Sequence, residues 1–256
     1  MALYLGIDIG GTKIAGGLVT SEGQILRRAE QPTPREGGRA ILDTALSVAR
    51  SLAAGDTLAG AGIGTGGQVD AERGVIVSAT DILPGWAGTD VKGAFEEAFH
   101  IPAAVENDVN ALAVGEARFG TARGLPTVVF LALGTGVGGA LLLNGRAHHG
   151  AHWVGGEFGH ILLSVDSHAR RAADGSVGSL EAYCSGPGLA QTWREIAASD
   201  DLSVTGHRIA GWAAREPNGP AAQAVRRTGE YLGYGLVTLA NALDPDRIVI
   251  GGGLAS

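Results

Sequence analysis

The stretch Leu3-Tyr-Leu-Gly-Ile-Asp-Ile-Gly-Gly-Thr-Lys13 decides the fold that we expect for this chain. Its apolar run reaches Asp8, a Gly-rich turn follows, and a second apolar run extends from Ile14 to Val19. A strand, a Gly-rich turn and another strand predict a hairpin. The same context excludes a Walker-type nucleotide loop, because that loop needs Gly-x4-Gly-Lys-Ser/Thr at the start of a helix.

The turn of this hairpin is open to two interpretations. Gly10 and Gly11 would let backbone N–H groups come close to a phosphate, and Thr12 and Lys13 would add side-chain donors. Alternatively, the glycines serve only the geometry of a tight turn. The turn taken alone does not decide between these interpretations.

A second copy of the hairpin follows later in the chain. Val128–Leu133 is another apolar run, and it leads into Gly134-Thr-Gly-Val-Gly-Gly139 and an apolar Ala140–Leu143. When the copies are overlaid, the matching positions are Gly11, Thr12, Gly16 and Leu18 with Gly134, Thr135, Gly139 and Leu141. The repeat predicts two similar lobes, each presenting a Gly-Thr turn to a shared cleft that holds phosphate from opposite sides. Chance similarity between short Gly-rich segments is the alternative.

A polar cluster, Glu106-Asn-Asp-Val-Asn110, lies between the two hairpins. It follows the apolar run Ile101–Val105 and leads into an Ala-rich helical pattern. Ligands of α/β proteins bind at such strand ends, and the Asp108 carboxylate is suited to accept a proton from a substrate hydroxyl. The alternative is that Asn107 or Asp108 only caps the helix, since both are favoured N-cap residues.

Apolar periodicity predicts the remaining elements. The expected helices are Ala40–Leu52, Val91–Phe99, Ala190–Ala198 and Ala221–Leu243, and the expected strands are Gly60–Gly64 and a last one that ends in Gly251–Gly253. Thr65–Asp70 is expected to be a loop and Asp81–Trp86 a turn. Thr80, Asp81 and Trp86 are candidates for substrate contact; alternatively, Trp86 covers the core and Asp81 caps the turn.

Two polar stretches follow the second hairpin. Glu157 and His160 lie among glycines, and an acceptor beside a donor is suited to the vicinal hydroxyls of a ligand. A surface turn with incidental polar residues is the alternative. Upstream, His148, His149 and His152 have no intervening acid and no convincing helix, so we expect a solvated loop there rather than a metal site.

Composition narrows the class of protein. The 256 residues are 45% apolar and 18% charged, which is ordinary for soluble globular proteins. A net charge of −7 without a basic block argues against nucleic acid or a membrane surface as the partner, and no apolar run is long enough to span a bilayer. Cys184, the single cysteine, excludes an internal disulfide and is expected to be buried and inert. A reducing cytoplasm and the absence of a signal peptide before Leu3 predict a cytoplasmic protein.

The order of these motifs resembles that of the ROK family of sugar kinases, which share the actin/hexokinase-type ATPase fold. The likeness runs from Leu5 to Leu254 and is carried by five motifs in register: Asp8-Ile-Gly-Gly-Thr-Lys13, Glu106-Asn-Asp108, Leu133-Gly-Thr-Gly136, Glu157-Phe-Gly-His160 and Ile248-Val-Ile-Gly-Gly-Gly253. It implies an α/β fold with two similar actin-like (ribonuclease H-like) lobes and a cleft between them. Residues 1–106 would form the N-terminal lobe and residues 107–256 the C-terminal lobe.

The resemblance also implies a role for each matching residue. It makes Asp108 the catalytic base in an ATP- and Mg²⁺-dependent phosphorylation of a sugar 6-hydroxyl. The residues that it puts on the sugar are Asn107, Asp108, Glu157, His160 and Glu181. Those that it puts on the nucleotide are Gly11, Thr12, Lys13, Gly134, Thr135 and Gly136 at the phosphates, Gly251 and Gly252 near adenosine, and Asp8 near Mg²⁺. A homodimer is implied in the same way.

One departure from the family concerns a metal. Most members carry Cys-x-Cys-Gly-x-x-Gly-Cys, followed by x-Glu, soon after the Glu-x-Gly-His segment. Here the three cysteine positions hold Ala172, Asp174 and Ser179, which leaves His160 as the one remaining ligand. A structural zinc takes four N or S ligands, so we expect no structural zinc. The Ser164–Gly178 loop is then expected to rely on packing or to stay disordered.

The sugar is harder to predict than the reaction. Thr65-Gly-Gly-Gln-Val69 with Ser78-Ala-Thr80 is more similar to the N-acetylmannosamine kinase branch than to the glucokinase branch, which tends towards a Pro-Gly loop there. In that likeness Gly67, Gln68 and Thr80 lie near the sugar or its acetamido group. N-acetylmannosamine is therefore favoured, and glucose and N-acetylglucosamine stay open.

Two rival functions follow from the departures. Family members normally continue beyond the Gly-Gly-Gly strand, so the C-terminal lobe is expected to lack its final helix and strand. With the lost cysteines, this keeps a catalytically impaired sugar-binding or regulatory protein open as the alternative. The retained Asp108 favours an enzyme, because a pure sensor has no need of a base. A DNA-binding repressor of the family is disfavoured, since the first strand starts at Leu3 and the charge is negative.

Overall fold

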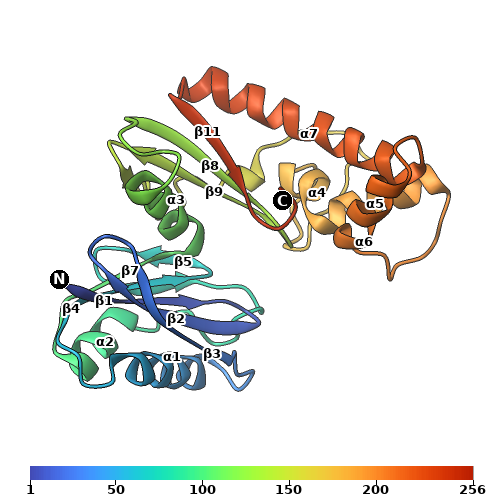
Figure 1. The fold of residues 1–256 in the computed structure, drawn as a ribbon. Coiled ribbons are helices and arrows are strands. Elements are labelled where there is room, and N and C mark those ends of the chain that lie inside the picture. The colour runs from blue at the N-terminus through green and yellow to red at the C-terminus, as the bar shows by residue number, and fades with distance from the viewer. Residues whose placement is uncertain (256) are drawn as a thin grey trace. The chain divides into compact units, whose positions relative to one another are not determined.

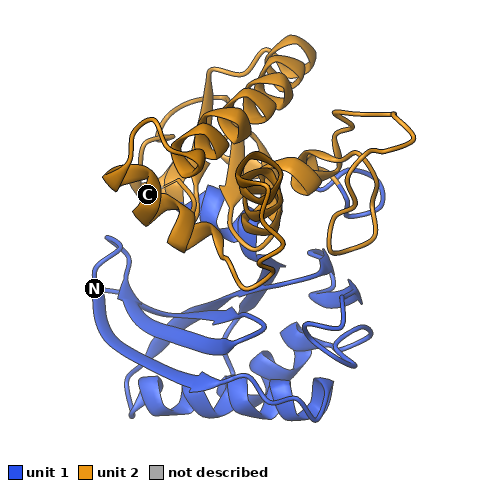
Figure 2. Cartoon of the chain, turned by 90° about the vertical axis from the view of Figure 1, so that its right-hand side faces the viewer, with its two compact units in different colours: residues 1–115, 149–154 blue, residues 116–148, 155–256 orange. Residues whose placement is uncertain are grey.

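The chain divides into two compact units in the computed structural model, which describes residues 1–255 (Figure 2). Unit 1 comprises Met1–Gly115 and His149–Val154; unit 2 comprises Glu116–His148 and the chain from Gly155 onward. Unit 1 thus extends beyond the lobe boundary expected after residue 106. The segment 149–154 joins unit 1 although the chain on both sides of it belongs to unit 2.

Unit 1 is built on a mixed five-stranded sheet with the order β3-β2-β1-β4-β7 (Figure 1). Its strands are β1 (Leu3–Ile9), β2 (Lys13–Thr20), β3 (Ile25–Pro32), β4 (Leu58–Thr65) and β7 (Ala103–Asn107). The predicted first hairpin is confirmed, since β1 and β2 pair in antiparallel fashion. Strands β1, β4 and β7 are parallel to one another, so their carboxyl ends lie at one edge of the sheet.

The helices of unit 1 bury one apolar face each. Helix α1 (Gly38–Ala53) places Ile41, Ala45, Val48 and Leu52 in the core, at the i, i+4, i+7 spacing of one helical face. Helix α2 (Val91–Phe99) buries Val91 and Phe95, and the Asp90 carboxylate caps it by accepting from the Gly93 N–H. Both helices lie on the same side of the sheet (Figure 1).

Two details of unit 1 differ from the sequence interpretation. Most of the stretch expected to be a loop is strand, because Thr65 ends β4 and β5 (Gln68–Asp70) pairs with β6 (Val75–Ser78) in a small separate hairpin. Trp86 is fully buried, and its indole N–H donates to the hydroxyl of Thr65 over 2.9 Å. Of the two roles left open for Trp86, the structure shows the core role.

Unit 2 repeats the hairpin in a four-stranded sheet with the order β10-β9-β8-β11. The strands are β8 (Thr127–Leu133), β9 (Val137–Leu143), β10 (Arg146–Ala147) and β11 (Arg247–Gly251). As in unit 1, the first strand of the hairpin also pairs with a parallel strand, here β11. The registers differ by one residue, because Ile9 faces Ile14 whereas Leu133 faces Val137.

Helices gather beside the sheet of unit 2 (Figure 1). They are α4 (Leu180–Cys184), α5 (Gly186–Ala197), α6 (Gly206–Arg215) and α7 (Pro220–Leu243), with a 3₁₀ turn η1 at Phe158–His160. The long predicted helices are confirmed, but α6 was not predicted. Gly206 and Gly211 weaken its helical pattern, although Thr205 is a regular N-cap whose hydroxyl accepts from the Arg208 N–H.

Helix α3 (Asp108–Phe119) starts in unit 1 directly after β7, and its last residues belong to unit 2. Separate apolar cores form in the two units, one around α1 and α2 and others around α4, α5 and α7. Within residues 1–255, no helix combines the length and the apolar character that crossing a bilayer would require.

Candidate functional site

The Glu106–Asn110 cluster lies at the carboxyl edge of the parallel strands in unit 1. Ile9, Thr65 and Asn107 are the last residues of β1, β4 and β7, and they stand side by side in the register. Asp8 and Asp108 therefore come from strand ends that meet at one edge, although 100 positions separate them in the chain. Such an edge is where open α/β sheets bind ligands.

Asn107 satisfies the start of helix α3. Its side-chain carbonyl accepts hydrogen bonds from the N–H groups of Val109 (3.0 Å) and Asn110 (3.2 Å). Its amide nitrogen donates to the carbonyl of Gly67 over 3.0 Å, which ties α3 to the turn before β5. The Asn107 side chain also hydrogen-bonds to the Asp108 carboxylate.

Because Asn107 caps α3, Asp108 is not needed as its main cap. Its Oδ1 accepts from the Val109 N–H over 2.8 Å, while the side chain keeps an exposed face. Surrounding protein still displaces enough water to raise the pKa of Asp108, against the lowering effect of N–H groups from Val109 and Asn107. A carboxylate with a raised pKa is a better proton acceptor than an ordinary one.

Asp8 shares this environment. Burial raises the pKa of Asp8, the negative charge of Asp108 raises it further, and Lys13 opposes both effects. Two carboxylates that repel one another form a region of negative potential, which a divalent cation would neutralise. The oxygen ligands here fit Mg²⁺, which prefers carboxylate oxygens and water.

Glu106 is held by three contacts that position the start of α3. Its Oε1 accepts from the Asn107 N–H (2.9 Å) and from the Asn110 amide (3.1 Å). Its Oε2 lies 2.6 Å from Nε2 of His149, whose ring also packs against Trp153. The expectation of a solvated loop is therefore wrong for His149, which is partly buried and fastened to Glu106.

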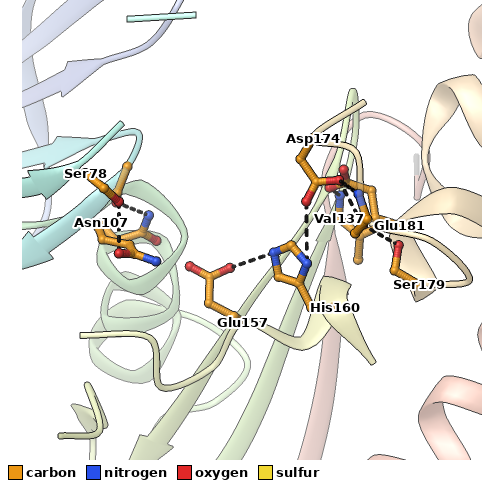
Figure 3. Close-up of polar contacts among 11 residues, drawn as sticks. Ser78, Asn107, Val137, Glu157, His160, Asp174, Ser179 and Glu181 are labelled. Atoms are coloured by element: carbon orange, nitrogen blue, oxygen red, sulfur yellow. Dashed lines mark hydrogen bonds and ion pairs between the residues drawn. The ribbon is translucent and has the colours of Figure 1, made fainter. Parts of the chain in front are cut away.

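The other expected sugar contacts of unit 1 come from its small hairpin. Gly67 has a φ of +99°, and a Cβ there would meet the carbonyl oxygen of Ser78, so the position requires glycine. The Gln68 side chain accepts a 2.9 Å hydrogen bond from the Ser78 hydroxyl. Thr80 is exposed. Figure 3 shows Ser78, which ends β6, and Asn107, which ends β7.

The turn of the first hairpin presents exposed backbone. Gly11 and Thr12 are exposed, and the Gly10 N–H closes the turn by donating to the Lys13 carbonyl over 3.1 Å. The Lys13 ammonium lies 2.7 Å from Oε2 of Glu30, with both side chains more than half exposed. An exposed pair of this kind is worth only about 0–1 kcal/mol, so it leaves Lys13 able to turn to another anion.

Glu181 supports the turn of the second hairpin. Oε2 of Glu181, in the first turn of α4, accepts a hydrogen bond from the Val137 N–H over 2.8 Å. The Gly134 carbonyl accepts from the Gly186 N–H at the start of α5 over 2.8 Å. Thr135 itself stays exposed. Glu181 therefore supports the Gly134–Gly136 turn with one of its oxygens.

The glycines at the end of β11 pack against β8. Gly252 has a φ of +91°, and a Cβ there would collide with the backbone of Leu133. Gly251 is the last residue of β11, beside Phe130. The glycines at this strand end therefore let the chain pass closely over the end of β8.

Glu157 is the N-cap residue of η1 in unit 2, and His160 is the last residue of η1 (Figure 3). His160 has carboxylates on both ring nitrogens, with Glu157 Oε2 4.0 Å from Nε2 and Asp174 Oδ2 3.5 Å from Nδ1. Partial burial acts to raise the pKa of Asp174. Hydrogen bonds from the Ser176 N–H and hydroxyl, together with His160, nevertheless bring this pKa below its usual value.

The donors around His160 do not fit a tetrahedral zinc. Asp174 spends Oδ1 on Ser176, and the Ser176 and Ser179 hydroxyls lie 3.0 Å apart (Figure 3). The methyl side chain of Ala172 has no atom that binds a metal, and structural zinc prefers thiolate and imidazole ligands. The polar atoms of this cluster are satisfied by one another. The absence of zinc remains a prediction.

The segment expected to be packed or disordered is packed. Most of its side chains are exposed, and it packs through Arg170, which is 8% exposed; a short bridge joins Arg171 to Val177. Cys184 is buried as expected; burial raises the pKa of its thiol to about 12, so the thiol is unreactive at neutral pH.

Sequence reasoning missed the roles of Glu106, His149 and Arg170. Glu106 was quoted only as part of its motif, and the two basic residues stand in segments whose local pattern is that of a polar loop. The sequence signal that was available for Arg170 is weak: a charged residue beside apolar Ala172 and Ala169. Only contacts made over long separations in the chain reveal these roles.

Comparison with known proteins shows the family and the fold of this chain. A family model described as the ROK family matches residues 4–256. The chain is 34% identical to a glucokinase of Streptomyces coelicolor, covering 100% of this chain and 83% of the relative. It is 34% identical to an N-acetyl-D-glucosamine kinase of Citrobacter koseri, covering 99% and 85%. A ROK glucokinase from Streptomyces griseus, solved with glucose and AMPPNP, superposes with a TM-score of 0.82 at 32% identity, covering 99% of this chain and 84% of that one.

Proposed function

The chain belongs to the ROK family, and we propose that it is an ATP-dependent kinase that phosphorylates the 6-hydroxyl of a hexose or N-acetylhexosamine. The observation that carries the proposal is the state of Asp108. Its carboxylate stands at the carboxyl edge of three parallel strands, with a raised pKa and an exposed face, while Asn107 takes over the capping of α3. A cap residue would need neither feature.

Phosphoryl transfer needs little covalent help from a protein. It needs positioned substrates, neutralised charge and a group that orients or deprotonates the attacking hydroxyl. In the proposed mechanism, a carboxylate oxygen of Asp108 accepts the proton of the sugar 6-hydroxyl as the γ-phosphoryl group leaves ATP. The bond formed joins the sugar oxygen to phosphorus, and ADP is the leaving group.

The proposed sugar-binding residues are those that the family likeness indicates. From unit 1 they are Gly67, Gln68, Thr80 and Asn107, and from unit 2 they are Glu157, His160 and Glu181. Support comes from their chemistry: Asn107 places an amide with donor and acceptor atoms beside Asp108, and Glu181 uses one carboxylate oxygen on Val137 and keeps the other. Mixed donors and acceptors of this kind are what vicinal hydroxyls require.

The proposed nucleotide site uses backbone rather than side-chain charge. Gly11, Thr12 and Lys13, and Gly134, Thr135 and Gly136, would donate to the phosphates, with Gly251 and Gly252 near adenosine. Mg²⁺, bound with ATP, would neutralise phosphate charge, and Asp8 is the residue that we propose lies near it. The like charge of Asp108 beside Asp8 supports a cation there.

The identity of the sugar is the finer part of the proposal. The 65–80 segment favours N-acetylmannosamine, whereas the relatives named above are a glucokinase and an N-acetyl-D-glucosamine kinase. The same family likeness supports a cytoplasmic protein that forms a homodimer. Sedimentation of the purified chain would test the dimeric state. A hexose or N-acetylhexosamine kinase is common to all these comparisons.

The test compares three sugars on two chains. Wild type and Asp108→Asn are assayed with ATP and glucose, N-acetylglucosamine or N-acetylmannosamine, and calorimetry measures sugar binding. We expect one sugar to be phosphorylated well and the variant to lose about 100- to 10,000-fold in kcat with sugar affinity kept. Near-normal turnover by Asp108→Asn contradicts the assignment of the base. Sugar binding without turnover by wild type would instead support a regulatory protein.

A further inference from the structure

Arg170 is a buried cation in a segment that is otherwise largely exposed. Only 8% of its surface is accessible, whereas Val165 in the same segment is 90% exposed. A buried charge is costly unless hydrogen bonds and counter-charges replace the water that it loses. The protein supplies both hydrogen-bond acceptors and a counter-charge to this side chain.

The hydrogen-bond partners of the Arg170 guanidinium come from helix α5. Nη1 donates to the hydroxyl of Thr192 (2.8 Å) and to the carbonyl of Gly188 (3.3 Å), and Nη2 lies 2.6 Å from Oε2 of Glu195. The planar guanidinium therefore contacts a hydroxyl, a carbonyl and a carboxylate. A lysine ammonium could not reach all three as a planar fork does.

Two aromatic rings complete the enclosure. The guanidinium carbon lies 4.9 Å from the ring centre of Tyr183 on α4 and 5.5 Å from that of Tyr231 on α7, within the range of cation–π attraction. The backbone N–H of Arg170 also donates to the Tyr183 hydroxyl over 3.3 Å. One side chain thus connects the 161–179 segment with α4, α5 and α7.

Main-chain hydrogen bonds connect Arg170 with the neighbours of His160 and Glu181. The Arg170 carbonyl accepts from the Gly178 N–H over 2.8 Å, and the Gly178 carbonyl accepts from the Leu163 N–H over 2.8 Å. The Leu180 N–H donates to the Ile161 carbonyl over 2.7 Å. Ile161 follows His160 directly, and Leu180 precedes Glu181.

We propose that Arg170 is a positioning residue: its buried guanidinium fixes the 161–179 segment so that His160 and Glu181 are held in place for the sugar. The proposal rests on the proposed function, because it takes those two residues as sugar ligands. Arg170 acts through these two residues. Its loss therefore weakens sugar binding most, and it affects the Gly134–Gly136 turn only through Glu181.

The experiment compares Arg170→Met, Arg170→Lys and the control Arg208→Met. Arg208 is an exposed arginine on α6 whose guanidinium carbon lies 5.1 Å from the ring centre of Trp212, so its loss removes a cation–π contact of unit 2 outside the segment. Two quantities are measured for each chain. One is KM for ATP and for glucose, N-acetylglucosamine or N-acetylmannosamine, whichever wild type phosphorylates; the other is amide hydrogen exchange at residues 161–180.

We expect Arg170→Met to raise the sugar KM about tenfold or more, with kcat and the ATP KM within about threefold of wild type. Amide exchange at Leu163, Gly178 and Leu180 should rise, because their hydrogen bonds depend on the anchored segment. Arg170→Lys should lie between, since it keeps the charge but loses the planar fork. Arg208→Met should match wild type.

Unchanged exchange in the segment, or an unchanged sugar KM with faster exchange, would overturn the positioning role. If Arg170→Met does not fold, Arg170→Lys carries the same two measurements, and a wild-type result for it overturns the proposal. If wild type phosphorylates none of the three sugars, the proposed kinase function is refuted. Faster exchange in Arg170→Met would in that case still support the anchorage.

Discussion

Oε2 of Glu106 and Nε2 of His149 lie 2.6 Å apart. This contact joins the residue that precedes Asn107 and Asp108 to the segment 149–154, which packs in unit 1 while its flanking chain belongs to unit 2. His149 packs in turn against Trp153, a residue with a left-handed backbone at φ +62°. The polar cluster at the start of α3 is therefore braced by a distant part of the chain.

Replacing His149 should disturb this brace. In His149→Ala, Glu106 loses a partner, so we expect stability to fall by about 1–2 kcal/mol and kcat/KM to fall several-fold as Asn107 and Asp108 lose support. Urea unfolding and steady-state kinetics measure the two effects. His152→Ala is the matched control, because His152 is an exposed neighbour in the same segment. Equal behaviour of the two variants would remove the role assigned to His149.

The pH profile of the reaction should report Asp108. A base acts only when deprotonated, and the pKa of Asp108 is raised by burial. We therefore expect kcat to fall as the pH drops through a value above the usual carboxyl pKa of about 4. Rates measured under conditions where circular dichroism shows an intact fold provide the check. The residual activity of Asp108→Asn should lack this acid limb.

The same raised pKa predicts a stability effect of opposite sign to the activity effect. A carboxyl whose folded-state pKa lies above its unfolded value favours folding fully at low pH, and loses that contribution as the pH rises through the folded-state pKa. Asp108→Asn keeps the oxygen that accepts from Val109 and has no charge, so its urea midpoint at pH 7 should exceed that of wild type. The difference should shrink below about pH 4. A variant less stable than wild type at neutral pH would contradict this.

Gly67 should tolerate no side chain. Gly67→Ala forces a Cβ onto a φ of +99° and into the Ser78 carbonyl, and it displaces the oxygen that accepts from Asn107. We expect a loss of about 2 kcal/mol or more of folding stability in urea unfolding. Gly62→Ala is the control, since Gly62 lies in nearby β4 with nothing within 4 Å of the added Cβ. Similar losses in both variants would show that the backbone at Gly67 is not special.

Chelation should leave the sugar side of the site intact. The His160 cluster offers one imidazole, one carboxylate and a hydroxyl in place of thiolates, so 1,10-phenanthroline in the presence of excess Mg²⁺ should not change the sugar KM or the thermal midpoint. Metal analysis of the purified chain should find less than stoichiometric zinc. One zinc per chain, lost together with sugar binding on chelation, would overturn this expectation.

Local patterns were sufficient for the elements that this chemistry needs. Apolar runs on each side of Gly11 and Gly134 predict hairpins because strand alternation and turn conformation are properties of neighbouring residues. The helix α6 escaped prediction because Gly206 and Gly211 dilute its periodicity, and β5 escaped it because three residues are too short to show alternation.

Local patterns and motif order predicted the two matched hairpins and the family, and they led to the proposal that Asp108 is the base. The tertiary structure alone decided which polar loop residues are structural: His149 at Glu106, Arg170 among three helices, and Asp174 at His160. The physical reason is that a basic or acidic residue in a polar loop has the same local pattern whether water or protein surrounds it. Its surroundings depend on residues far away in the chain, and these meet it only when the cores of the two units form.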